Sequence, residues 1–328
     1  MKERKRPILY IVVPCFDEEE VLPETKRVLE EELEKLVQKR QILKKSKLVF
    51  VDDGSRDGTW GLIEKFSREK NIEGVKLSRN FGHQAALLAG LNFARENGAD
   101  ATVTIDADLQ DDPRVIREMV EEFRRGAEIV FGVRESRETD TRFKRGTARG
   151  FYKLMNFFGA KTVPDSADFR LLSRRAVEEL EKFKEVNLFL RGIVPEIGLK
   201  TAKVEYKRGK RVAGKSKYPL RKMIHFAAEG ITSFSTKPIK LVFLAGALIS
   251  LLSAGVLVYA VVVKLLGQTV SGWTFIIVSI WLLGGAQMIA IGIIGEYIGK
   301  IYLETKGRPR FIVEKTTRSS RAFRSSRK

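Results

Sequence analysis

Runs of apolar and β-branched residues alternate with amphipathic stretches through the first part of the chain. The runs occupy residues 8–14, 47–51, 75–77, 101–105 and 128–134. Each short run has the length and composition of a strand, and the stretches between them have the spacing of helices. Strands that alternate with helices predict a parallel sheet with helices on both faces. The first part of the chain is therefore predicted to be of the α/β class.

A different pattern follows, because residues 241–263 and 272–295 are almost free of charge. Each stretch reaches the roughly 20 residues that a bilayer-spanning helix needs. The preceding residues 221–236 combine apolar positions with basic ends, which favours a helix in the membrane interface. A helical hairpin buried in a soluble core is the alternative for the two apolar stretches. The chain is thus divided into a soluble domain (1–220), an interfacial helix (221–236), a two-helix transmembrane hairpin (237–300) and a basic tail (301–328). We expect residues 306–328 of this tail to be disordered and held near anionic lipid.

The charge balance indicates a polyanionic neighbour, since 60 Lys and Arg residues stand against 41 Asp and Glu, a net charge of +19. The sequence has no zinc-ligand spacing and no RNA-platform motif, and its basic tail adjoins the apolar spans. An anionic membrane is therefore favoured over nucleic acid. The lone Cys15 excludes an intrachain disulfide framework and fits a reducing compartment.

The distribution of cations also predicts an orientation. The link at 264–271 holds one cation, whereas several Lys and Arg residues flank the outer ends of both spans. The positive-inside rule then places both termini and the soluble domain in the cytoplasm, on the inner (plasma) membrane. Gly292, Gly295 and Gly299 make one face of the second span small, which favours close helix packing and a homo-oligomer.

Carboxylates follow directly after the apolar run at 101–105. Asp106 and Asp108 are expected at the carboxyl edge of the sheet, where open α/β sheets bind ligands. Two carboxylates so close together repel unless a divalent cation lies between them, and Mg²⁺ or Mn²⁺ takes such oxygens together with substrate phosphates. A metal-bound nucleotide diphosphate is therefore predicted. Asp112 and Pro113 are interpreted instead as the start of a helix.

Three further loops carry polar residues that suit a nucleotide. Asp52 and Asp53 end the run at 47–51 and are interpreted as nucleoside-binding, with a plain connecting loop as the alternative. The loop at 78–84 has Arg, Asn and Gly before a helix, a pattern that suits phosphate or sugar. For Asp17, spacing favours a helix cap over a contact with base or ribose. No partner for His83 is apparent in the sequence, and we expect no catalytic or metal-binding role for it.

Basic residues further along suit a second anionic substrate. Arg134, Arg145 and Arg149 can hold phosphate oxygens, since Arg presents a fork of donors to them. The Gly- and Lys-rich segment 207–218 is interpreted as an anion-binding lid, with a solvated run of charge as the alternative. Asp168 is expected in a turn, where a helix cap and a reacting carboxylate are equally compatible with its surroundings.

Several of these motifs in combination resemble a known family. They are the segments 51–55, 77–82, 106–111, 168–171 and 211–218, followed by the two spans. The chain resembles the polyprenyl-phosphate glycosyltransferases of glycosyltransferase family 2, the dolichol-phosphate-mannose-synthase-like group. Within that group it is most similar to the bacterial two-span branch that makes polyprenyl-phosphate glucose.

The resemblance implies a GT-A (Rossmann-like) fold and assigns roles to single residues. It implies Mg²⁺ or Mn²⁺ at Asp106, Asp108 and Gln110, and Asp168 as the proposed base. Nucleotide-sugar contacts fall on Pro14, Asp17, Asp53, Arg79, Asn80 and Asp106, and lipid-phosphate contacts on Arg134, Arg145, Arg211, Ser216 and Lys217. Two positions depart from the family: Asp17 stands where Asn is usual, and His83 where Lys is common.

The expected activity is an inverting, metal-dependent transfer of a hexose to a membrane polyprenyl phosphate, with Asp108 and Asp168 as the catalytic carboxylates. By likeness the donor is UDP-glucose, with GDP-mannose and UDP-N-acetylglucosamine as alternatives. Within enzymes, the other acceptor to consider is a lipid or polysaccharide hydroxyl. A non-catalytic nucleotide-sugar-binding membrane scaffold is the alternative outside enzymes.

Overall fold

The structure, a computed structural model, describes residues 4–135, 166–185, 189–207, 209, 237–266 and 272–317. The chain forms two compact units. The first comprises Met1–Tyr152, Lys161–Tyr218 and Pro309–Lys328, and the second comprises Lys153–Ala160 and Pro219–Arg308. The predicted interfacial helix at 221–236 lies outside the described residues.

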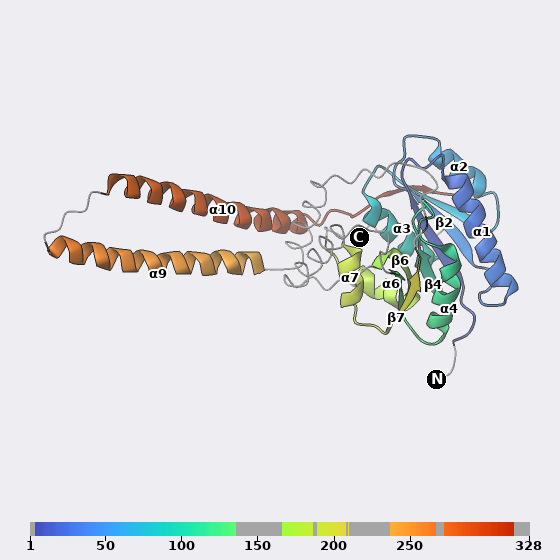
Figure 1. Ribbon diagram of the computed structural model, residues 1–328. Helices are drawn as coiled ribbons and strands as arrows, with labels where there is room; N and C mark the ends of the chain where they lie inside the picture. The colour runs from blue at the N-terminus through green and yellow to red at the C-terminus, as the bar shows by residue number, and fades with distance from the viewer. Residues whose placement is uncertain are drawn as a thin grey trace. The chain divides into compact units, whose positions relative to one another are not determined.

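An eight-stranded sheet forms the centre of the first unit, with the strand order β7-β5-β6-β4-β1-β2-β3-β8 (Figure 1). Its strands are β1 (Leu9–Cys15), β2 (Lys47–Asp52), β3 (Ile72–Leu77), β4 (Ala101–Thr104), β5 (Ile129–Arg134), β6 (Ser166–Ser173), β7 (Thr201–Tyr206) and β8 (Val313–Thr316). The pairs β1–β2, β2–β3, β1–β4 and β5–β7 are parallel. The prediction of an all-parallel sheet is wrong at two strands. β6 runs antiparallel between β4 and β5, and β8 runs antiparallel to β3.

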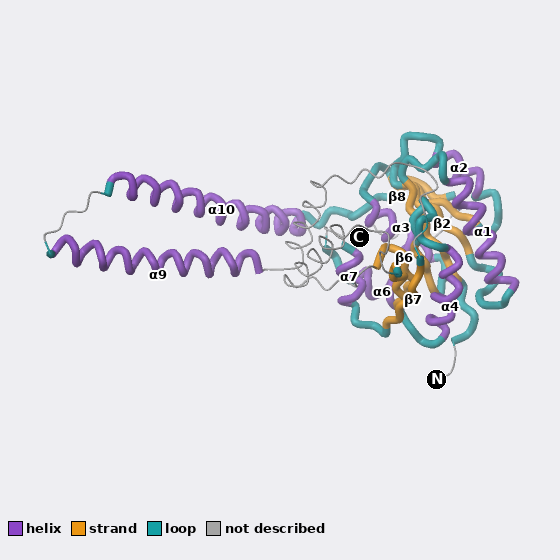
Figure 2. Tube along the Cα trace, in the orientation of Figure 1, coloured by secondary structure: helices purple, strands orange, loops and turns teal. Residues whose placement is uncertain are grey.

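Helices cover both faces of this sheet, as predicted (Figure 2). They are α1 (Leu22–Gln38), α2 (Thr59–Phe66), α3 (His83–Glu96), the 3₁₀ helix η1 (Pro113–Val115), α4 (Ile116–Arg124), α6 (Arg174–Glu181) and α7 (Leu190–Glu196). On one face α1, α2 and α4 pack against Leu9, Ile11 and Val13 of β1. On the other face α3 packs against Tyr10 and Val12. Because successive side chains of a strand point to opposite faces, β1 is buried on both sides and reads as a continuous apolar run.

The approach of α3 to the sheet depends on small residues. A Cβ added to Gly90 would lie 2.3 Å from Cγ1 of Val12, so the helix could not pack as closely with any larger residue. This contact brings the first residues of α3 to the carboxyl ends of β1 and β2, where the loops described below meet.

The expected disorder of the basic tail is wrong for residues 313–316, because they form β8 in the sheet of the first unit. The charge of the tail predicts disorder, but Val313 and Phe311 pack against the buried cluster around β3 and α3. Pairing with the edge of an existing sheet supplies hydrogen bonds that a segment of this composition cannot make alone.

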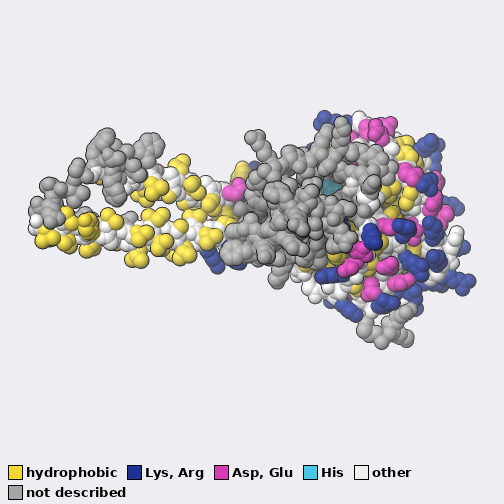
Figure 3. All heavy atoms as spheres, in the orientation of Figure 1, with side chains coloured by type: hydrophobic (Ala, Val, Ile, Leu, Met, Phe, Trp, Pro, Cys, Tyr) yellow, Lys and Arg dark blue, Asp and Glu magenta, His cyan; other side chains and the backbone are white. Residues whose placement is uncertain are grey.

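The second unit contains α9 (Lys237–Leu265) and α10 (Trp273–Thr305), which extend beyond the predicted limits of the two spans. Residues 237–256 and 282–305 are long and apolar enough to cross a membrane, and no part of these windows is buried. Apolar side chains cover the outside of both helices in Figure 3. A helical hairpin buried in a soluble core does not match this exposure. A surface of this kind is typical of contact with lipid or with another protein.

Candidate active site

The acidic loop that follows β4 lies at the carboxyl edge of the sheet, as predicted. Leu109, between Asp108 and Gln110, has a φ of 52°, in the left-handed region that a non-glycine residue enters only when its surroundings require it. The Gln110 amide donates to Oδ1 of Asp108 at 3.2 Å. Burial raises the pKa of Asp106 to about 6, and the charges of Asp168, Asp111 and Asp108 add to the rise while His83 opposes it.

Asp106 and Asp108 are the predicted ligands of a divalent ion. Oδ1 of Asp106 is buried and has no hydrogen-bond partner, which suits a cation, and Nε2 of His83 lies 3.5 Å from the same oxygen. Among the described residues, no three His, Cys, Asp or Glu side chains are grouped to hold a metal ion. An ion held by Asp106 and Asp108 would therefore take its remaining ligands from substrate phosphates and water, as Mg²⁺ does.

The neighbouring acids have other partners. Asp111 is buried, accepts a hydrogen bond from the Tyr206 hydroxyl and lies 3.3 Å from Nη2 of Arg134. Asp112 caps η1, because its Oδ1 accepts the Arg114 amide at 3.0 Å and Pro113 is the first residue of the turn. The interpretation of Asp112 and Pro113 as a helix start is thus confirmed.

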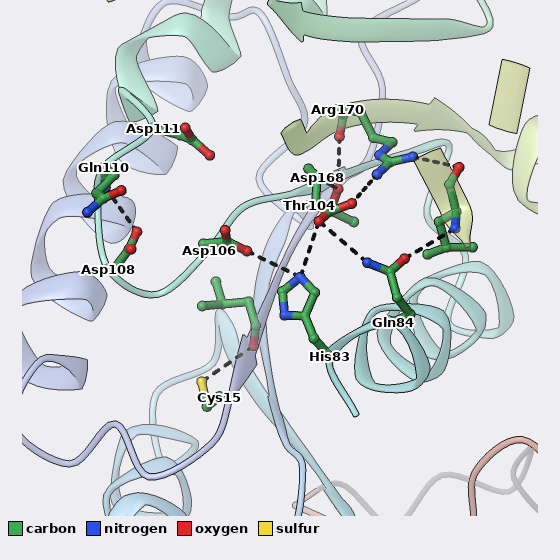
Figure 4. A network of polar contacts seen from close by, with 12 residues as sticks. Cys15, His83, Gln84, Thr104, Asp106, Asp108, Gln110, Asp111, Asp168 and Arg170 are labelled. Carbon is green, nitrogen blue, oxygen red and sulfur yellow. Dashed lines mark hydrogen bonds and ion pairs between the residues drawn. The ribbon is translucent and has the colours of Figure 1, made fainter. Parts of the chain in front are cut away.

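His83 joins this loop to β6, a contact that the sequence did not indicate (Figure 4). It is the first residue of α3, and its Nε2 lies 3.5 Å from Oδ1 of Asp106 and 3.5 Å from Oδ2 of Asp168. Burial by itself lowers the pKa of His83. The hydrogen bond with Asp168 and the charge of Asp106 outweigh that effect and raise the pKa above its ordinary value.

Asp168 lies within strand β6, so its predicted position in a turn is wrong. Its side chain is 4% exposed and is paired with the guanidinium groups of Arg170 and Arg191, the latter at 2.8 Å. Gln84 Nε2 donates to Oδ2 of the same carboxylate at 3.5 Å. Burial alone would raise the pKa of Asp168, but His83, Arg170 and Arg191 hold it well below its ordinary value. A carboxylate held in this way is a weak proton acceptor.

A cavity of about 190 Å³ opens beside this network. Three of the predicted nucleotide-sugar residues, Pro14, Asp53 and Asn80, lie in its wall, whereas Asp17, Arg79 and Asp106 do not. The lining residues are Pro14, Cys15, Phe16, Glu18, Asp53, Asn80, Gly82, His83 and Ala86.

Asp53 holds two loops of the cavity wall together. Its two carboxylate oxygens accept the amides of Phe81 and Gly82, at 2.8 and 2.9 Å. Asp53 therefore differs from Asp106 of the other predicted acid pair. It is 3% exposed, and both of its carboxylate oxygens accept hydrogen bonds from backbone amides.

Asp17 does not cap α1, so that interpretation is wrong. The helix begins at Leu22 without a side-chain cap, while Oδ1 of Asp17 accepts the Arg56 amide at 2.8 Å. Asp17, with a φ of 53°, therefore connects the loop after β1 to the loop after β2.

The predicted phosphate-binding arginines are described only in part. Arg134 ends β5 and contacts Asp111 and the Tyr206 hydroxyl, the latter at 3.3 Å from its Nε. Arg79 lies over the ring of Phe81, with 4.0 Å between its Cζ and the ring centroid. Five predicted contacts lie outside the described residues: Arg145, Arg149, Arg211, Ser216 and Lys217.

Sequence reasoning missed His83, Gln84, Arg170 and Arg191. For Arg170 a signal was available, since residues 168 and 170 of a strand point to the same face. Arg191 and Gln84 carry no comparable signal, because only folding brings α3 and α7 to β6.

The chain is similar in sequence and in fold to known proteins. A family model described as "Glycosyl transferase family 2" matches residues 10–181. The chain is 54% identical over 313 residues to "Uncharacterized glycosyltransferase YkoT" of Bacillus subtilis (strain 168), covering 95% of this chain and 93% of that protein. It is 40% identical over 315 residues to "SfII prophage-derived bactoprenol glucosyl transferase" of Shigella flexneri, covering 94% and 98%. The solved mannosyltransferase PcManGT from Pyrobaculum calidifontis, in complex with GDP-Man and Mn²⁺, has a TM-score of 0.41 at 17% identity and covers 89% of this chain and 87% of that chain. The family match and the mixed sheet confirm the expected GT-A fold.

Proposed function

This chain belongs to glycosyl transferase family 2 and is a glycosyltransferase. From that premise we propose that it transfers glucose from UDP-glucose, with inversion, to a membrane polyprenyl phosphate. The observation that carries the proposal is the meeting of Asp106, His83 and Asp168 beside the cavity that Pro14, Asp53 and Asn80 line. A relative named as a bactoprenol glucosyl transferase aligns over 94% of the chain, including both apolar helices, which supports the lipid acceptor and the sugar.

The donor occupies the carboxyl edge of the sheet in this proposal. Its nucleoside lies in the cavity beside Asp53 and Asn80, and its diphosphate lies toward Asp106 and Asp108. A bound Mg²⁺ or Mn²⁺ would neutralise the charge that develops on the leaving diphosphate. Asp106 and Asp108 would hold this ion, and Nε2 of His83 lies 3.5 Å from Oδ1 of Asp106.

The state of Asp168 favours a phosphate acceptor over a hydroxyl. An attacking hydroxyl needs a general base, and a carboxylate held by two guanidinium groups is a poor one. A phosphate monoester has a second pKa near 6 and is largely dianionic at pH 7, so it attacks without losing a proton. Asp168 then acts by holding Arg191 and His83 in place, where their positive charge offsets repulsion between two anionic substrates.

The acceptor also explains the apolar helices. We propose that α9 and α10 span the inner membrane with both termini cytoplasmic, which keeps the site near the phosphate of a lipid that cannot leave the bilayer. The small face formed by Gly292, Gly295 and Gly299 supports packing against a second copy, a homo-oligomer. Arg134, Arg145, Arg211, Ser216 and Lys217 are proposed to hold the lipid phosphate.

Release of nucleotide diphosphate by the detergent-purified chain tests the proposal. UDP-glucose, GDP-mannose and UDP-N-acetylglucosamine are compared, each with Mg²⁺, Mn²⁺ or EDTA, and with or without polyprenyl phosphate. The expected result is UDP release that needs both a divalent ion and polyprenyl phosphate. Anomeric analysis of the product by NMR then checks inversion.

Other outcomes select the alternatives. GDP release identifies a mannosyltransferase, and turnover with polyprenol but not its phosphate identifies a hydroxyl acceptor. Nucleotide-sugar binding without turnover on any lipid leaves a binding scaffold and overturns the proposal.

A further inference from the structure

Residues 309–317, here called the C-terminal segment, complete the sheet of the catalytic unit after the chain has left α10. In β8, Val313 pairs with Leu77, Lys315 with Lys76 and Thr316 with Val75. Thr317 extends the contact, because its amide donates to the Gly74 carbonyl at 3.0 Å and its Oγ1 accepts the Gly74 amide at 2.8 Å. The edge of β3 is therefore covered by a strand that lies more than 230 residues later in the sequence.

The contact continues into the loop at 78–82, here called the donor loop. The Ser78 amide donates to the Ile312 carbonyl at 2.9 Å, directly after the last ladder pair at Leu77. Phe311 and Val313 of the C-terminal segment and Phe81 of the donor loop all pack against the buried cluster that contains Val75 and Leu77. One end of the donor loop is thus anchored by the C-terminal segment.

The other end is anchored from β2. Asp53 accepts the amides of Phe81 and Gly82. Gly54, with a φ of 72°, lies so close that an added Cβ would be 2.5 Å from the carbonyl carbon of Arg79. Because the donor loop carries Asn80 and Gly82 in the cavity wall and leads directly to His83, its position sets the shape of that wall.

We propose that the C-terminal segment is a positioning element for the nucleotide sugar, and that the donor site is complete only when β8 is paired with β3. The role assigned to the cavity rests on the proposed function. The mechanism is preorganisation: a loop held at both ends loses less freedom when the donor binds, so affinity for the donor falls when one anchor is removed. Because the segment acts only on the donor loop in this proposal, kcat and the KM for polyprenyl phosphate are expected to stay the same.

Two truncations of the full chain test this inference. One ends after Arg308 and lacks the C-terminal segment, and its matched control ends after Thr317 and lacks only residues 318–328. The first is expected to raise the Kd for UDP and the KM for the donor about five- to tenfold, the effect of about one hydrogen bond with its packing. The kcat and the KM for polyprenyl phosphate stay within about twofold, which indicates lost donor binding. The control is expected to match the full chain.

Point variants separate positioning from loss of fold. Phe311→Ala is expected to raise the donor KM in a protein that still unfolds cooperatively, and Phe311→Leu to restore it. Glu314→Gln removes an ion pair with Lys76 of β3, at 3.3 Å. Because a solvent-exposed pair contributes little, this variant is expected to leave the donor KM unchanged.

A donor Kd that is equal in the two truncations overturns the inference, as does a Phe311→Ala variant with unchanged donor KM. A full chain that binds no nucleotide at all points instead to failure of the proposed function, because the inference concerns only the difference between variants.

Discussion

Among the described residues, four side chains contact the carboxylate of Asp168. Arg170, Arg191, His83 and Gln84 surround it, and Arg170 is itself only 2% exposed. Removal of one charge of a buried pair leaves the other without compensation, which costs more than the pair contributes. At the scale of single residues, the site therefore depends on Asp168 for the placement of its cations.

Asp168→Asn is expected to lower the free energy of unfolding by about 3 kcal/mol at pH 7, because it leaves Arg170 buried without an opposite charge. The pKa of Asp168 is lowered in the folded state, so its stabilisation is present above the ordinary value of 3.8 and is lost as the pH falls through the lower, folded value. The difference between wild type and variant should shrink below about pH 4. Near neutral pH it should become smaller as the pH rises, because Asp168 raises the pKa of His83 and that contribution is lost when His83 gives up its proton. Denaturant unfolding in detergent across this range measures it. A difference that stays the same from about pH 4 down to about pH 2 contradicts the assignment.

Asp108→Ala is expected to reduce kcat about a thousandfold without unfolding the protein, because a Lewis-acid contribution of several kcal/mol is lost with the ion. The matched control is Asp112→Ala in the same acidic stretch. That change removes the cap of η1 and a surface ion pair with Arg114, and should cost about 1 kcal/mol of stability with turnover retained. Steady-state UDP release and thermal unfolding of both variants provide the measurement. Full turnover in folded Asp108→Ala rules out Asp108 as a metal ligand.

At the scale of elements, the antiparallel strand β6 builds the site. Its register against β4 and β5 places Arg170 opposite Thr104 and Phe131. This pairing brings Asp168, two residues earlier on the same face, toward Asp106 and the start of α3. A parallel strand would need a long crossover at this point, and its side chains would arrive at the edge in a different order.

The apolar helices allow a second test at this scale. Leu251 and Leu252 lie near the middle of α9 and are 71% and 62% exposed. Replacement of both by Arg adds about 5 to 7 kcal/mol to the insertion of a span, so the protein should no longer resist alkaline extraction from membranes. Replacement of both by Ala serves as the control and should remain membrane-bound. Equal resistance of the Arg variant argues against a span at α9.

At the scale of the whole molecule, the distribution of charge predicts the orientation of the two proposed spans. Lys237, Lys240, Lys300 and Lys306 flank the outer ends of α9 and α10, whereas Lys264 is the one cation of the link at 264–271. Alkaline phosphatase fused within 267–271 is expected to be active in living cells, and the same enzyme fused after Lys328 inactive. A fluorescent protein at the C-terminus should give the reverse result. Phosphatase activity at the C-terminus contradicts the orientation.

Local patterns determined much of this molecule in advance. The apolar runs predicted β1, β2, β4 and β5 because strands buried on both faces must be apolar at every position. The position of Asp106 and Asp108 after such a strand predicted their place at the carboxyl edge. The two long uncharged stretches predicted α9 and α10, since few other structures of that length are so free of charge.

Tertiary structure decided the remainder, because it depends on contacts between distant segments. Nothing near Asp17 indicates that its partner is the Arg56 amide, and nothing near His83 indicates that Asp106 and Asp168 lie 3.5 Å away. The tail was predicted from its charge to be disordered, yet 313–316 form a strand, because the edge of β3 supplies the hydrogen bonds that the segment lacks alone. The sequence by itself determined strands β1, β2, β4 and β5, the two long apolar helices and the acids that reach the carboxyl edge. Only the folded sheet, with β6 and β8 antiparallel, decided which cations hold those acids and which segment completes the donor loop.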